Sequence, residues 1–161
     1  MQTNKMFLKE VLGIGSAILI LSLLIQNLRY SNIGFLNYFL PARTTIFEMM
    51  KGYFLAITLL IFIEYFIIIE LPNNYLLSRV IGAFLMMILT TIIYLIFPKL
   101  FVNNLSLSFV ILISILFGQV GSYFIQKIKI RWSYFLGFAN YFIIAFLMFL
   151  FTLFPSGGLF L

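Results

Sequence analysis

The acidic side chains are where chemistry would have to begin, because the 161 residues contain only Glu10, Glu48, Glu64 and Glu70 as acids. The chain has no Cys, His or Asp. These absences exclude thiol chemistry, His/Cys zinc sites, Ser-His nucleophilic catalysis and Asp-rich magnesium sites. No Ser stands beside a Lys in a way that singles out a Ser-Lys pair. We therefore expect a protein that is not an enzyme and that binds neither a metal nor a cofactor.

Glu64 is the most informative of these acids, because it falls inside an apolar segment. Its neighbours one turn away on a helix are Leu60, Ile61, Ile67 and Ile68, and none of them offers a hydrogen bond or a countercharge. An ionised side chain in mid-membrane costs about 3 kcal/mol on insertion scales. The partner of Glu64 must therefore come from another helix, from water or from its own protonation.

Three further polar residues are predicted at the depth of Glu64. Counting about 1.5 Å per residue from the cytoplasmic end of each predicted helix places one layer at a depth of roughly 9 to 14 Å, and its members are Glu64, Gln119, Asn140 and Ser16. Gly118 and Gly121 flank Gln119 and allow a neighbouring helix or a ligand to approach closely. Two interpretations stay open: these groups only bond to one another between helices, or they form a proton-linked or solute-binding layer.

A second polar cluster, Arg43, Glu48 and Lys51, lies at the start of the second predicted helix. Glu48 opposes the positive end of the helix, and Glu48 with Lys51 forms an i, i+3 pair. Ordinary helix capping accounts for this pattern. We predict that the cluster faces the outer aqueous boundary near Ser156.

The elements that position these residues are transmembrane helices. The chain is 64% hydrophobic and 9% charged, and its mean hydropathy is +1.18, whereas soluble domains are about 25% charged. A water-soluble globule is excluded. Since about 20 apolar residues cross a bilayer, the uncharged runs predict one all-α domain over residues 1–161, a polytopic bundle of five helices at approximately 7–28, 45–70, 79–97, 105–126 and 132–154.

The boundaries of these helices follow from local signals. The first helix resembles a signal peptide, but its uncharged run is longer than a typical apolar core of such a peptide and no small-x-small cleavage site follows it. Pro98 ends the third helix, and Asn103-Asn104 precedes the fourth. The apolar, aromatic-rich segment 30–46 is predicted to lie in the outer membrane interface, either as a connector or as an interfacial helix.

The distribution of Lys and Arg predicts the orientation. With the N-terminus inside, six cations lie on the cytoplasmic side and four on the outer side. Lys127, Lys129 and Arg131 provide the strongest bias, because they share one short connection without an acid. We predict a cytoplasmic N-terminus and an external C-terminus. The net charge of +6 does not indicate nucleic-acid binding, since the cations are spread between apolar segments.

Several short motifs resemble an uncharacterised family of small polytopic membrane proteins, found mostly in Gram-positive bacteria. The start of the family's second helix is similar to Pro41, Thr45, Ile46, Phe47, Glu48 and Lys51. Ile63-Glu64-Tyr65 resembles an Ile-Glu-Tyr of the same family helix, and Phe151-Thr152-Leu153-Phe154-Pro155 with Leu159-Phe160 resembles its terminus. Two family histidines have no counterpart here. The resemblance implies a multi-pass protein of the bacterial cytoplasmic membrane and lends no reaction.

These observations lead to one functional expectation and two alternatives. We expect a non-enzymatic membrane component that binds or transports a small solute or lipid at an intramembrane site around Glu64. The first alternative is an accessory subunit that docks a larger membrane protein. The second is the substrate-binding subunit of an energy-coupling transporter, although the Ala-x-x-x-Ala contact typical of such subunits is absent. The expected partners are the lipid bilayer with a lipid or small-molecule ligand, or a membrane protein.

Overall fold

The computed structural model describes residues 46–67, 71, 74–102 and 104–153, and these residues form helices joined by short connections. The four long helices are α2 (Ile46–Ile67), α3 (Tyr75–Ile96), α4 (Asn104–Lys127) and α5 (Ser133–Leu153). Each is long and apolar enough to span a bilayer. The all-α membrane bundle is therefore confirmed for this part of the chain. The predicted helix 7–28 and all of the segment 30–46 except Ile46 lie outside the described residues, and the orientation stays a prediction.

Local signals explain where most of these helices begin and end. α3 stops before Pro98, whose ring cannot continue a helix, and the chain turns through the 3₁₀ helix η2 (Pro98–Phe101) into α4 at Asn104. These two predicted boundaries are confirmed. The predicted start of the third helix at Arg79 is wrong, because α3 begins one turn earlier, at Tyr75. The prediction took Arg79 for a cation at the membrane boundary, whereas Arg79 is buried inside the bundle.

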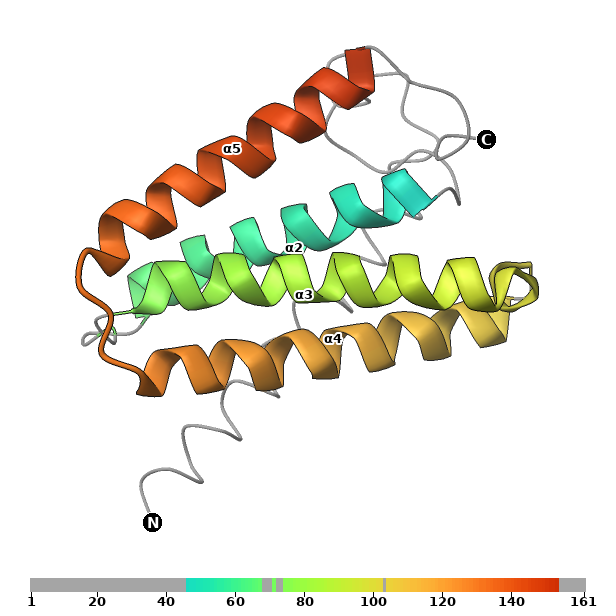
Figure 1. The fold of residues 1–161 in the computed structure, drawn as a ribbon, viewed down its shortest axis with the longest axis horizontal. Helices are drawn as coiled ribbons and strands as arrows, with labels where there is room; N and C mark the ends of the chain where they lie inside the picture. Colours follow the sequence, from blue (N-terminus) through green and yellow to red (C-terminus); the bar gives the residue numbers. More distant parts are fainter. Residues whose placement is uncertain (1–45, 68–70, 72–73, 103, 154–161) are drawn as a thin grey trace.

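The four helices lie side by side, with successive helices running in opposite directions (Figure 1). α3 is the central helix and packs against α2, α4 and α5. The C-terminal ends of α2 and α4 and the N-terminal ends of α3 and α5 lie at one end of the bundle, and η2 lies at the other (Figure 1). We call the first of these the basic end, because it carries Lys127, Lys129 and Arg131.

Small residues bring α3 and α4 together along an antiparallel line of facing pairs. A Cβ atom on Gly118 would lie 2.6 Å from the backbone oxygen of Gly82, so this approach requires glycine. The predicted close approach at Gly118 is thereby confirmed. Along the interface the pairs in contact are Ser78 with Gln126, Gly82 with Ser122, Met86 with Gly118, and Thr90 with Ser114.

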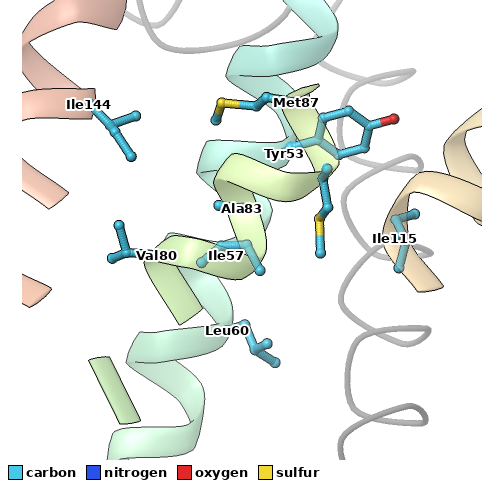
Figure 2. Packing of buried hydrophobic residues seen from close by; sticks show 9 residues of the cluster. Tyr53, Ile57, Leu60, Val80, Ala83, Met87, Ile115 and Ile144 are labelled. Carbon is cyan, nitrogen blue, oxygen red and sulfur yellow. The ribbon is translucent and has the colours of Figure 1, made fainter. Parts of the chain in front are cut away.

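The apolar core lies between α2 and α3, with single residues from the other two helices on either side (Figure 2). α4 contributes Ile115 and α5 contributes Ile144, while the remaining members are Tyr53, Ile57, Leu60, Val80, Ala83, Met86 and Met87. Large apolar side chains also cover the outside of the bundle, where a bilayer rather than water solvates them. The polar groups inside the bundle therefore need hydrogen-bond partners within it.

Candidate functional site

An ion pair between α2 and α3 forms the centre of the candidate site. Arg79 Nε donates a hydrogen bond to Glu64 Oε2 at 3.0 Å, and Arg79 Nη2 donates one to Glu64 Oε1 at 2.8 Å. The Arg79 residue is 1% exposed, and the Glu64 side chain is 13% exposed. This two-bond geometry matches the planar fork of the guanidinium to both carboxylate oxygens. The two opposite charges of the pair thus balance each other within the apolar bundle.

Tyr75 and Gln119 complete the cluster around this pair. The Tyr75 hydroxyl donates to Glu64 Oε2 at 2.5 Å, and Arg79 Nη1 donates to Gln119 Oε1 at 3.1 Å. The Arg79 guanidinium also lies 5.4 Å from the centre of the Tyr75 ring, within the range of a cation–π contact. Three helices, α2, α3 and α4, therefore contribute to what we call the Glu64 cluster: Glu64, Tyr75, Arg79 and Gln119.

The sequence predicted part of this cluster. The partners of Glu64 come from another helix, one of the expected sources, since Tyr75 and Arg79 both belong to α3. Gln119 joins the same cluster through its bond to Arg79. Arg79 itself was missed, because it was taken for a boundary cation. One signal could have found it: Glu64 lies three residues before the end of α2, and Arg79 lies four residues after the start of α3. Residues placed so symmetrically about a helical hairpin lie at similar depths.

The predicted place of Asn140 in the same layer is wrong. Asn140 is exposed on α5, and its Nδ2 donates to Leu136 O of its own helix at 2.8 Å. Depth counting gives the height of a residue along a helix but not how closely that helix packs against its neighbours. The buried residues of α5 are Ser133, Gly137 and Ile144, and Asn140 shares their helical spacing. It is nevertheless exposed, because α5 packs loosely: only 11% of its apolar stretch is buried. Ser16, the fourth member of the predicted layer, lies outside the described residues.

A second ion pair lies at the opposite end of α2. Lys51 Nζ lies 2.8 Å from Glu48 Oε1 and 5.4 Å from the centre of the Phe47 ring. The predicted i, i+3 pair is thus confirmed. The expectation that Lys51 faces water is wrong, since Lys51 is 4% exposed. Its long apolar stem packs among neighbouring side chains. Arg43 lies outside the described residues.

Three hydroxyl groups, which the sequence analysis did not predict to meet, lie in contact inside the bundle. Thr90 Oγ1 lies 3.0 Å from the Tyr53 hydroxyl and 2.9 Å from Ser114 Oγ. A threonine hydroxyl has a single proton, so Thr90 donates one of these bonds and accepts the other. This hydroxyl triad links α2, α3 and α4 by hydrogen bonds and stabilises their packing.

Two apolar grooves flank α5, which is less closely packed than the other helices. One groove of about 350 Å³ lies between α2 and α5 and includes Tyr65 and Phe138 in its lining. The other, of about 360 Å³, lies between α5 and the α2–α3 pair, and three methionines, Met50, Met87 and Met148, line it. Each exceeds the roughly 150 Å³ of an engineered cavity that binds benzene. Both are large enough for part of a hydrocarbon chain.

The groups that the bundle brings together offer charge and hydrogen bonds. Within the described part of the chain, no three His, Cys, Asp or Glu side chains gather where they could hold a metal ion. The Glu64 cluster presents a guanidinium, a phenol and an amide around one carboxylate. No family model, no curated protein and no solved structure matches the chain. The resemblance to the uncharacterised bacterial family stays a prediction.

Proposed function

We propose that the protein is a non-enzymatic membrane component that binds or transports a small solute or lipid, with the Glu64 cluster as its polar site. One observation carries the proposal: a paired carboxylate and guanidinium lie buried among apolar helices. Ionisable residues inside transmembrane helices are costly, and they commonly mark binding sites or ion pathways.

The donor groups of the cluster suggest which ligands fit. The Arg79 guanidinium and the Tyr75 hydroxyl both donate to the same carboxylate. An external carboxylate or phosphate group presents the same acceptor oxygens and would compete with Glu64 for these donors. We therefore expect a ligand that carries an anionic group, and the apolar grooves beside α5 favour one that also carries hydrocarbon.

The test uses two matched double variants that each replace an ion pair by two amides. The protein is purified in a mild detergent, and native mass spectrometry records the bound lipids and small molecules. Glu64→Gln with Arg79→Gln should lose the bound ligand, because the charge complementarity is gone. Glu48→Gln with Lys51→Gln, at the other end of α2, should retain it. Equal retention by both double variants would contradict the proposed site.

A second candidate function is an accessory subunit that docks a larger membrane protein, and the packing of α5 favours it. Only 11% of the apolar stretch of α5 is buried, against 33 to 44% in the other three helices. Its outward face carries large aromatic side chains, including Phe135, Phe138, Phe142 and Phe146. A stoichiometric membrane-protein partner in the purified sample, without a bound small molecule, would favour this second function.

A further inference from the structure

The polar groups that lack a hydrogen-bond partner gather in one part of the molecule. Among the described residues, four buried side-chain atoms have none: Asn74 Oδ1, Gln119 Nε2, Ser122 Oγ and Gln126 Oε1. All four lie at the contact between α3 and α4, in the half of the bundle that contains the Glu64 cluster. Because buried polar groups in native proteins are nearly always bonded to protein or to ordered water, such a concentration requires an explanation.

Three of these residues follow one face of α4. Gln119, Ser122 and Gln126 are spaced three and four residues apart, which places them above one another on a helix. Each faces α3: Gln119 accepts from Arg79, Ser122 lies beside Gly82, and Gln126 Nε2 donates to Ser78 Oγ at 3.1 Å.

This line, which we call the polar file, connects the Glu64 cluster with the basic end. It rises about 10 Å from Gln119 to Gln126. Beyond Gln126, Asn74 Nδ2 donates to the backbone oxygens of Ile125 and Ile128. Exposed Lys127 and Lys129 follow at this end of α4. The file thus leads from a buried ion pair to an end of the bundle that carries exposed charges.

The mixture of unpartnered atoms indicates which molecule would satisfy them. Gln119 Nε2 can only donate, Asn74 Oδ1 and Gln126 Oε1 can only accept, and Ser122 Oγ can do both. An anion cannot donate to the two amide oxygens, and a hydrocarbon can bond to none of these atoms. Water both donates and accepts, and buried water typically makes about three hydrogen bonds.

We infer that the polar file of Gln119, Ser122 and Gln126, with Asn74 at its outer end, holds a line of water that gives the Glu64–Arg79 pair aqueous access from the basic end. This deepens the proposed function, because it supplies the route by which a proton or a small polar solute reaches the site. The water path and the proposed ligand binding can be tested separately, because hydration is measured without any ligand. The path can be present when ligand binding fails, and ligand binding can occur when the path is absent.

The test exploits the absence of native cysteine, since any introduced thiol is then the only one. Ser122→Cys and Ser114→Cys are a matched pair on α4, because both serines are fully buried. Ser114 belongs to the hydroxyl triad, whereas Ser122 Oγ has no partner. Silver ions, which react with thiolates and fit a narrow aqueous path, are added to one side of membrane vesicles. The thiols left unreacted are then counted with a fluorescent maleimide after denaturation.

We expect Ser122→Cys to react at least about 10-fold faster than Ser114→Cys, because a thiol ionises and reacts only where water reaches it. Silver should react with Ser122→Cys when it is added to the side of the membrane from which Ile128→Cys is labelled. Gln126→Cys, nearer to the basic end, should react faster than Ser122→Cys and serves as the second variant. Equal inertness of Ser122→Cys and Ser114→Cys, or reaction of Ser122→Cys only from the opposite side, would overturn the inference.

Discussion

The Glu64–Arg79 pair makes a quantitative prediction about the stability of the bundle. Replacing Glu64 by Leu removes the carboxylate that receives two hydrogen bonds from a guanidinium that is 1% exposed. Breaking one side of a buried ion pair costs about 3–5 kcal/mol, because the other charge is left without its countercharge. We expect this loss in the free energy of unfolding for Glu64→Leu and a similar loss for Arg79→Leu.

The double variant separates charge pairing from ordinary hydrogen bonding. Three hydrogen bonds reach Glu64, and neutral bonds between membrane helices average about 0.6 kcal/mol each, so their loss alone amounts to roughly 2 kcal/mol. If charge pairing dominates, removing both charges relieves most of the penalty. We expect the double Leu variant to lose about 1–3 kcal/mol instead of the roughly 6–10 kcal/mol that two independent losses would give.

The measurement is reversible unfolding in bicelles or mixed micelles, applied to wild type, both single variants and the double variant. Glu64→Gln adds a sharper contrast, since it keeps the shape and an acceptor oxygen but not the charge. It should be nearly as unstable as Glu64→Leu. Additive losses within about 0.5 kcal/mol, together with a stable Glu64→Gln, would refute the argument that a charge pair holds α2 to α3.

Three further predictions concern helix packing, the hydroxyl triad and the orientation. Gly118→Ala should destabilise by about 1–3 kcal/mol, because its new Cβ would meet a backbone oxygen at 2.6 Å. Gly121→Ala should cost less than about 1 kcal/mol, since it meets only the end of a flexible leucine; equal costs in thermal unfolding would argue against the close α3–α4 contact. Thr90→Val should lower the free energy of unfolding by about 1–2 kcal/mol, because it removes the bonds to two hydroxyl partners. Thr91→Val should be nearly neutral, because the Thr91 hydroxyl bonds only within its own helix. The same unfolding assay compares the two variants, and a larger loss for Thr91→Val would contradict the role of the triad. A cysteine at Ile128 should react with a membrane-impermeant maleimide from the cytoplasmic side, as the positive-inside rule requires, and labelling of intact cells from outside would reverse the orientation.

The sequence determined the class of protein and most of the helix boundaries. Hydropathy and charge spacing suffice for this, because a bilayer accepts only long apolar helices whose backbone bonds are satisfied internally. The breaks at Pro98 and at Asn103-Asn104 and the close approach at Gly118 also followed from local properties of those residues. Glu64 stood out as a residue in need of a partner, since an unpaired carboxylate among apolar neighbours is costly.

Only the tertiary structure decided which residues meet. The count of residues along each helix brought Gln119 to the level of the Glu64–Arg79 pair. The count could not show that α5 packs loosely, so it wrongly placed Asn140 among the buried polar groups. Arg79 and Lys51 were assigned to the membrane surface by their charge, yet both are buried beside a glutamate. A countercharge offsets much of the cost that a buried charge carries alone. Lys51 finds its countercharge within α2, but the partner of Arg79 lies on another helix, so that pairing depends on how α2 and α3 rotate and pack against each other.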